Sequence, residues 1–312
     1  MNDLPQVHMK TGLPERVRIY EVGARDGLQN EKTIIDLETK VEFIERLIAA
    51  GLPIVEATSF VHPEWVPQLA DAADVVARLP LDGPLPLPVL VPNVRGLARA
   101  LESGCQHIAI FASATEAFAL KNLNCSFSEQ FDTFKPVVDQ AVRAGVDVRG
   151  YVSMCFGDPW EGRVELDRVV ETGLRLFDLG ISELSLGDTI GVGTPGHVHD
   201  LISAFGDAGV GSDRLALHFH DTYGQALANT YAALEASITT FDASAGGIGG
   251  CPYAKSATGN LATEDLVWML NGLGIEHGVD LDVLVSTSTW MAGKLGRPSP
   301  SAVVRALGGV SA

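Results

Sequence analysis

Leu215-Ala-Leu-His-Phe-His-Asp-Thr222 is an apolar run that ends in two histidines. Alternate residues of a β-strand point to the same side of the sheet, so His218 and His220 can converge on one ion where the strand ends. The pattern therefore predicts a pair of metal ligands. The alternative is that both histidines are ordinary core or loop residues, as most histidines in such a pair are. Other residues of the chain are needed to distinguish a metal-ligand pair from ordinary core or loop histidines.

Around this stretch, the chain consists of eight successive units in which an apolar strand is followed by an amphipathic helix. Such alternation gives a parallel sheet, and eight units in about 260 residues favour a closed α/β barrel of the (β/α)₈ or TIM type over a doubly wound sheet. The predicted strands and their helices are 17–23 with 37–50, 53–58 with 66–79, 87–91 with 95–102, 108–111 with 127–144, 146–152 with 166–179, 183–186 with 195–205, 215–220 with 226–236, and 239–244 with 264–273.

Length and composition allow one large domain or two modest ones. No internal repeat, low-complexity segment or linker splits the chain, so we predict a single domain over residues 1–312, with residues 280–312 as a short C-terminal helical extension. The net charge of −17 argues against sequence-independent binding to nucleic acid or to an anionic membrane. No apolar run approaches the ~20 residues of a membrane span, and the N-terminus lacks the pattern of a signal peptide. Four scattered cysteines without Cys-x-x-Cys pairing are typical of reduced thiols. We therefore predict a cytoplasmic protein.

Polar residues gather at the predicted strand ends, where the active site of a TIM barrel lies. Among them, Asp26, His218, His220 and Asn260 form a mixed oxygen and nitrogen ligand set that leaves room for substrate. This set suits Mg²⁺ or Mn²⁺, and Zn²⁺ or Co²⁺ can compete because imidazole binds them well. The alternative for Asp26 alone is a helix or loop cap. The other residues at strand ends are Arg25, Gln29, Glu56, Asp188, Cys251, Glu264 and Asp265.

Two glycine-rich segments follow strands. Ala245-Gly-Gly-Ile-Gly-Gly-Cys-Pro-Tyr-Ala254 predicts a flexible loop in which Cys251 could shuttle a proton, although a lone cysteine is more often a small buried hydrophobe. Gly191-Val-Gly-Thr-Pro-Gly196 formally matches the dinucleotide pattern G-x-G-x-x-G. No acidic residue ends a strand about 20 positions later, so we interpret this segment as a tight loop beside Asp188.

Several runs of the sequence resemble the 3-hydroxy-3-methylglutaryl-CoA lyases, which belong to a superfamily of metal-dependent lyase and synthase barrels. Arg-Asp and His-x-His mark the whole superfamily, whereas Gly-Gly-Cys-Pro-Tyr indicates the lyase branch. One departure is the loop 254–259, where a glycine is expected near position 256, and neither a Cys-Lys-Leu tail nor a transit peptide is visible. The similarity covers about residues 17–274, and its strongest runs are 21–32, 185–196, 218–229, 249–254 and 259–265.

The resemblance implies a site whose residues are all present here. It places the metal ligands at Asp26, His218, His220 and Asn260, the catalytic arginine at Arg25 and the loop cysteine at Cys251. It also implies supporting acids, which fall on Glu56, Asp188, Glu264 and Asp265.

The activity implied by the resemblance is retro-Claisen cleavage of (S)-3-hydroxy-3-methylglutaryl-CoA to acetyl-CoA and acetoacetate, as in leucine degradation and ketone-body metabolism. A divalent metal would acidify the C3 hydroxyl, and Arg25 would hydrogen-bond the developing thioester oxyanion. His218 or a neighbouring carboxylate would accept the hydroxyl proton, and Cys251 would protonate the acetyl-CoA carbanion. Lys32 is the candidate contact for a CoA phosphate; the alternative is a solvated surface lysine.

Three other functions stay open. One is a related lyase that acts on a larger 3-hydroxy-3-alkylglutaryl-CoA. Another is a Claisen-type synthase of the isopropylmalate or homocitrate kind, but such enzymes usually carry a long regulatory domain, and only about 40 residues follow the eighth unit here. The third is a noncatalytic metal-binding barrel, which would need a lost catalytic residue, and none is missing. The expected partner is an acyl-CoA thioester, without nucleic acid or membrane, and a homodimer is compatible with the sequence.

Overall fold

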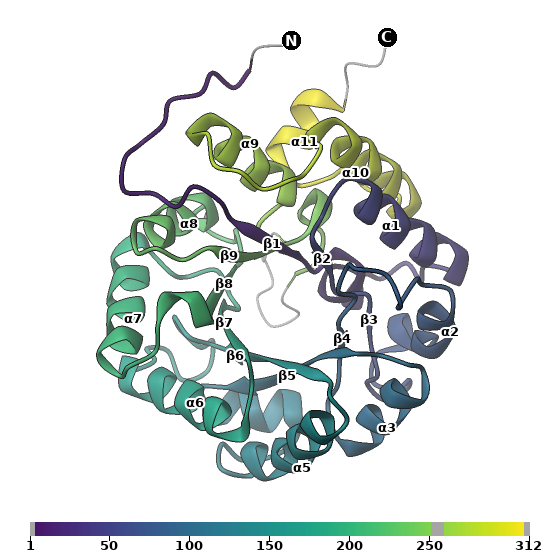
Figure 1. Cartoon of the computed structure of the whole chain (residues 1–312), viewed down its shortest axis with the longest axis vertical. Helices are drawn as coiled ribbons and strands as arrows, with labels where there is room; N and C mark the ends of the chain where they lie inside the picture. Colours follow the sequence, from purple (N-terminus) through teal and green to yellow (C-terminus); the bar gives the residue numbers. More distant parts are fainter. Residues whose placement is uncertain (1–3, 251–258, 309–312) are drawn as a thin grey trace.

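Parallel strands form a ring at the centre of the molecule, and helices surround it (Figure 1). The computed structural model describes residues 4–250 and 259–308. Neighbouring strands follow the order β2-β1-β9-β8-β7-β6-β5-β4-β3. Their bounds are β1 Arg18–Glu21, β2 Ile54–Val55, β3 Thr58–Ser59, β4 Val89–Leu90, β5 His107–Ser113, β6 Asp147–Ser153, β7 Glu183–Asp188, β8 Leu215–Phe219 and β9 Thr240–Ala243.

The ring closes through the extended segment that contains β2 and β3. β2 pairs with β1, whereas β3 pairs with β4. Between them, the Glu56 N–H donates to the Glu21 carbonyl at 2.8 Å, and the Ala57 N–H donates to the Pro88 carbonyl at 2.9 Å. One segment thus bonds to both of its neighbours, so that the nine short strands make eight barrel strands. The predicted (β/α)₈ barrel is confirmed.

The outer helices follow the strands in the predicted order. Local signals explain their ends: Asp36 caps α1 by accepting a hydrogen bond from the Thr39 N–H, and Gly180 ends α6 in a left-handed conformation with φ of 112°. The bounds are α1 Leu37–Ala49, α2 Ala72–Ala77, α3 Val94–Glu102, α5 Glu129–Arg143, α6 Leu166–Leu179, α7 Pro195–Asp207, α8 Ala226–Glu235 and α9 Thr263–Leu273. Among the described residues, no helix is long and apolar enough to cross a membrane.

The C-terminal extension contains α10 Leu281–Leu295 and α11 Ala302–Leu307, which lie beside α1 and α9 (Figure 1). Trp290 of α10 lies against α1, with its ring centroid 6.4 Å from that of Phe43 and 4.6 Å from the guanidinium carbon of Arg46. The predicted helical extension is therefore confirmed, and it packs against the helices α1 and α9.

Three segments differ from the sequence prediction. The first is a π-helical turn, η1 Gly23–Gly27, at the start of the predicted loop after strand one. The helix expected at 66–79 is split into η2 Pro67–Leu69 and α2, because the chain bends at Ala70 and Asp71. The third is a pair of short helices between β5 and α5, α4 Glu116–Phe118 and η3 Ala119–Leu123, which are too short to show a periodic pattern.

Alternate strand residues separate an apolar layer from a polar barrel interior. Ile19 and Phe241 are fully buried in the core cluster that the strands share with the helices. Tyr20, Asp242 and His218 occupy the alternate positions and are register partners across β1, β9 and β8. Because neighbouring residues of a strand point to opposite sides, these polar side chains lie inside the barrel.

Candidate active site

Asp26, His218 and His220 each place one potential ligand atom within 4.8 Å of the others. Asp26 belongs to η1, directly after β1, whereas His218 lies in β8 and His220 just beyond it. The two imidazole centroids are 5.3 Å apart. Barrel closure places β1 and β8 on either side of β9, and this brings the Arg-Asp and His-x-His runs to one point.

Asn260 completes this group from the loop after β9. Its Nδ2 atom donates to Oδ2 of Asp26 at 2.9 Å and to the Ile248 carbonyl at 3.2 Å. Its Oδ1 atom and Nδ1 of His220 are buried without a hydrogen-bond partner among the described residues. An orphaned amide oxygen and an orphaned imidazole nitrogen beside a carboxylate are donor atoms that a divalent cation would satisfy. The residues therefore fit a metal ion.

The pKa shifts of Asp26 and His220 favour the protonation states that bind a cation. Burial, together with the charge of His218, lowers the pKa of His220 to about 4, so its imidazole is neutral near pH 7. Burial acts to raise the pKa of Asp26, but the positive charges of Arg25 and His218 and the hydrogen bond from Asn260 outweigh it and lower this pKa. The group thus presents an ionised carboxylate and a neutral imidazole, which are the protonation states that a metal requires.

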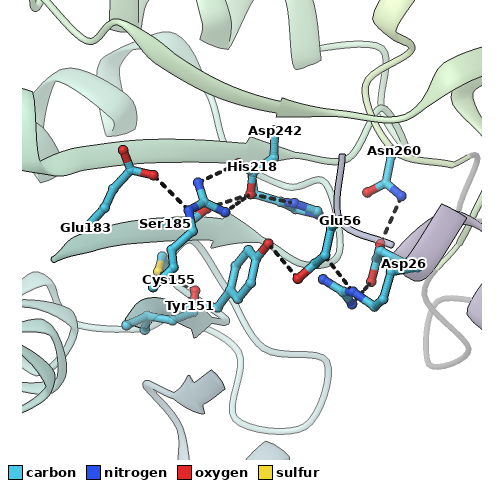
Figure 2. A network of polar contacts seen from close by, with 12 residues as sticks. Asp26, Glu56, Tyr151, Cys155, Glu183, Ser185, His218, Asp242 and Asn260 are labelled. Atoms are coloured by element: carbon cyan, nitrogen blue, oxygen red, sulfur yellow. Dashed lines mark hydrogen bonds and ion pairs between the residues drawn. The ribbon is translucent and has the colours of Figure 1, made fainter. Parts of the chain in front are cut away.

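Arg25 lies beside this group and is fixed by two carboxylates. Its Nε atom donates to Oε2 of Glu56 at 2.6 Å, and Nη1 donates to Oδ1 of Asp26 at 2.7 Å (Figure 2). Glu56 is fully buried and also accepts a hydrogen bond of 3.3 Å from the hydroxyl of Tyr151. Burial lowers the pKa of Arg25, but the charge of Glu56 outweighs this and raises it, so the guanidinium stays charged. Arg25 is therefore a fixed cation next to the candidate metal ligands.

A cavity of about 430 Å³ opens over these residues. Its wall combines the polar side chains of the site with apolar and aromatic ones, which suits a ligand with a polar reactive end and a partly apolar chain. Gly250 belongs to the wall, and its carbonyl accepts a hydrogen bond of 2.9 Å from Asn30. Cys251, the next residue, lies outside the described residues. The other wall residues include Arg25, Asp26, Gln29, Trp65, Phe118, Lys121, Tyr151, His218 and His220.

Asp188 lies at the end of β7 but is not part of the cavity wall. Its two carboxylate oxygens accept hydrogen bonds of 2.9 Å from the N–H groups of Val192 and Gly193. A Cβ atom on Gly193 would lie 2.9 Å from Asp188 Oδ2, so only glycine fits there. Burial raises the pKa of Asp188 to about 6. In this structure Asp188 holds the tight glycine loop that follows β7.

Glu264 and Asp265 likewise lie outside the cavity wall. Glu264 is fully buried and accepts hydrogen bonds from the Gly246 N–H at 2.8 Å and from the Ser288 hydroxyl. Burial raises its pKa to about 8. Asp265 accepts hydrogen bonds of 2.7 Å from the Ser301 hydroxyl and 2.8 Å from the Val303 N–H, at the start of α11. These two acids fasten the loop after β9 and the C-terminal extension.

The cavity wall includes a lysine in addition to Arg25. Lys32 is exposed and does not line the cavity, whereas Lys121 of η3 does, with its amine 4.9 Å from the ring centroid of Trp160. Sequence analysis missed Lys121 because it missed η3. It also missed Arg149 and Asp242, although charged residues inside apolar strand runs were a visible signal.

Comparison with known sequences identifies relatives that cover most of this chain. The sequence profile of the HMGL-like family matches residues 16–291. Hydroxymethylglutaryl-CoA lyase of Rattus norvegicus mitochondria is 49% identical over 94% of this chain and 90% of that protein. The mitochondrial enzyme of Arabidopsis thaliana is 52% identical over 95% of this chain, which spans 63% of that longer protein.

Solved structures agree with the sequence relatives. The HMG-CoA lyase of Pseudomonas aeruginosa has a TM-score of 0.92 and 47% identity, covering 95% of this chain and 98% of that one. An HMG-CoA lyase of Acinetobacter baumannii in complex with coenzyme A and 3-methylmalate has a TM-score of 0.90 and 32% identity, covering 98% and 99%. Since the profile match alone spans most of the barrel and relatives near 50% identity span nearly the whole chain, the chain belongs to the HMGL-like family.

Proposed function

We propose that the protein is a metal-dependent hydroxymethylglutaryl-CoA lyase that cleaves (S)-3-hydroxy-3-methylglutaryl-CoA to acetyl-CoA and acetoacetate. The observation that carries this proposal is the convergence of Asp26, His218 and His220 beside a fixed arginine in one cavity. The relatives from Rattus norvegicus and Arabidopsis thaliana, which carry this name, support it. We treat residues 1–312 as a single catalytic domain.

Asp26, His218, His220 and Asn260 would hold the divalent cation. When bound, it would supply Lewis acidity that makes the C3 hydroxyl of the substrate easier to deprotonate. Carboxylate and amide oxygens favour Mg²⁺ or Mn²⁺, while the two imidazoles also suit Zn²⁺ or Co²⁺.

Arg25 stabilises the negative charge that develops on the thioester oxygen as the carbon–carbon bond breaks. Glu56 and Asp26 hold its guanidinium in place before the reaction, so little reorganisation is needed when the charge appears. Tyr151 bonds to the other oxygen of Glu56 and lines the cavity, and it thereby supports the same orientation.

Two proton transfers complete the reaction. His218 or a neighbouring carboxylate accepts the proton of the C3 hydroxyl, and both kinds of group line the cavity. We assign protonation of the acetyl-CoA carbanion to Cys251, which directly follows the cavity residue Gly250. Glu264 is the weaker candidate for this acid because its buried carboxyl group is occupied by Gly246 and Ser288.

The CoA part of the substrate needs a cation in an otherwise acidic protein. We keep Lys32 as a candidate phosphate contact and add Lys121, which lines the cavity. The binding of coenzyme A by the Acinetobacter baumannii relative supports an acyl-CoA ligand. We also propose a homodimer and a cytoplasmic location. The relatives from Rattus norvegicus and Arabidopsis thaliana are named as mitochondrial.

Acetyl-CoA release from a panel of 3-hydroxy-3-alkylglutaryl-CoA thioesters, with Mg²⁺ or Mn²⁺ present, tests this function. We expect the methylglutaryl thioester to be cleaved fastest and cleavage to stop when a chelator removes the cation. Faster cleavage of a larger thioester would favour the related lyase. No cleavage, with condensation of acetyl-CoA and a 2-oxo acid instead, would favour a Claisen-type synthase.

A further inference from the structure

Asp242 of β9 is a fully buried carboxylate directly beside His218 of β8. The two residues are register partners in the sheet, and Nδ1 of His218 lies 3.2 Å from Oδ2 of Asp242 (Figure 2). Asp242 does not line the cavity, whereas His218 does. Asp242 therefore does not contact a ligand in the cavity and can position one only through another residue.

Arg149 of β6 and Ser185 of β7 fix this carboxylate from the far side of the barrel interior. Arg149 donates from Nη2 to Oδ1 of Asp242 at 2.6 Å and from Nη1 to Oδ2 at 3.2 Å. The Ser185 hydroxyl donates to Oδ2 at 2.7 Å. The guanidinium of Arg149 is itself held by Nε donation to Glu183 at 2.8 Å and lies 3.9 Å from the ring centroid of Tyr20. Asp242 thus has one orientation and a permanent countercharge.

An ionised carboxylate only accepts hydrogen bonds, so the hydrogen between the two groups belongs to Nδ1 of His218. In its neutral form, which a metal ligand must have, the His218 imidazole then keeps its lone pair on Nε2, the other ring nitrogen. A carboxylate behind a ligand histidine fixes the tautomer and the ring orientation and makes the ligand nitrogen more basic. His220 differs, because its buried Nδ1 has no partner among the described residues.

We propose that Asp242, held by Arg149 and Ser185, is a positioning residue that orients His218 with Nε2 toward the candidate metal site. This inference rests on the proposed function, because it assumes that His218 is a metal ligand. The two histidines then have different tasks: His218 is oriented by the barrel interior, and His220 is placed by the loop residue Asn260, its bridge partner. Because both ring nitrogens of His218 are then engaged, the neighbouring carboxylate is the base for the C3 hydroxyl.

Mn²⁺ binding to the chelator-treated full-length protein, measured by calorimetry without substrate, tests the proposal. We expect Asp242→Asn to weaken Mn²⁺ binding about 10- to 100-fold, the usual effect of losing such a partner. In a His218→Gln background, Asp242→Asn should have almost no further effect, because the residue through which it acts is gone. Equal weakening with and without His218 would overturn the proposal.

A variant that removes both buried charges separates positioning from stability. Asp242→Asn leaves the buried Arg149 with Glu183 as its remaining carboxylate partner and could prevent folding. Asp242→Asn combined with Arg149→Met removes this problem, and we expect its Mn²⁺ affinity to stay low although thermal unfolding shows a folded protein. Recovery of wild-type affinity in this folded double variant would overturn the proposal.

Glu183→Gln is the matched control, since Glu183 contacts Arg149 but not Asp242. It should bind Mn²⁺ nearly as tightly as the wild type, and equal weakening by Glu183→Gln would contradict the specific role of Asp242. Thioester cleavage by the wild type separates the two proposals. Loss of Mn²⁺ affinity in Asp242→Asn supports the inference even if the wild type cleaves no thioester, whereas a wild type that binds no Mn²⁺ overturns it.

Discussion

Two pairs of carboxyl groups in this barrel lie in opposite electrostatic settings. Asp26, at the candidate metal site, and Asp242, behind His218, each contact an arginine, at 2.7 and 2.6 Å. Burial acts to raise the pKa of both groups, but the positive charges beside them outweigh it, so both pKa values lie below the ordinary value. These two groups stay ionised.

The other pair, Glu21 and Glu264, lies under the loop that follows β9. Glu21 accepts hydrogen bonds from the N–H groups of Gly23 and Ala245 and from the Thr263 hydroxyl. Among the described residues, neither glutamate has an ion-pair partner, and burial raises the pKa of Glu21 to about 7 and that of Glu264 to about 8.

The difference shows that burial alone does not determine the role of an acid in this protein. At Asp26 and Asp242 the positive charges within hydrogen-bond distance outweigh burial and keep the carboxylates charged, which suits metal binding and charge stabilisation. At Glu56, burial raises the pKa although Arg25 donates to this carboxylate at 2.6 Å. A buried acid that contacts only N–H and O–H groups tends toward the neutral form, and its hydrogen bonds anchor the backbone.

The largest expected effect is that of Asp26→Ala. It removes the ionised ligand, so we expect turnover to be abolished and Mn²⁺ binding to be strongly weakened in equilibrium dialysis. His220→Ala should act in the same direction. Unchanged Mn²⁺ affinity in both variants would show that the candidate metal site is wrong.

Cys251→Ala tests whether the loop fastened by Glu21 and Glu264 also takes part in chemistry. Loss of a positioned general acid should lower kcat by ~10²–10⁴-fold while Mn²⁺ affinity stays intact. The triple replacement of the remaining cysteines, Cys105, Cys125 and Cys155, serves as the control and should leave kcat unchanged. Near wild-type turnover in Cys251→Ala would leave this cysteine a structural role only.

Arg25→Lys tests the cation at the metal site. Lysine keeps the positive charge but cannot bond to Glu56 and Asp26 as a planar fork, so kcat should fall by ~10²-fold or more with little change in KM. Arg46→Lys, on the surface of α1, is the control and should retain full activity. A normal kcat with a raised KM would assign Arg25 to substrate binding.

The smallest effect concerns the dependence of stability on pH. The unfolded chain releases the protons of Glu21 and Glu264 near the ordinary pKa of 4.5, whereas the folded protein retains them up to about 7 and 8. The folded state therefore binds more protons between these values, and each group lowers the free energy of unfolding as pH rises, by at most about 1.4 kcal/mol per pH unit.

Glu264→Gln keeps the neutral form at every pH, so urea unfolding of the metal-free variant should show a shallower decline from pH 6.5 to 8 than the wild type. Glu42→Gln, on the exposed face of α1, should not change the slope. An unchanged slope in Glu264→Gln would contradict the neutral state assigned to this acid.

Much of the fold could be predicted because its pattern is local. Short apolar strands and amphipathic helices repeat eight times, and Asp36 and Gly180 mark helix ends within a few residues. The η3 segment, which carries Lys121, could not be predicted because one short turn has no period.

The sequence by itself determined the barrel and the residues that gather at its mouth, since strand ends and the spacing of His218 and His220 are properties of the local chain. Only the tertiary structure decided which acids stay charged. Arg149 lies 93 residues from Asp242, and Ser288 lies 24 residues from Glu264. Closure of the ring and docking of α10 bring these partners together, and the charge of a buried carboxyl group depends on the partner that it meets.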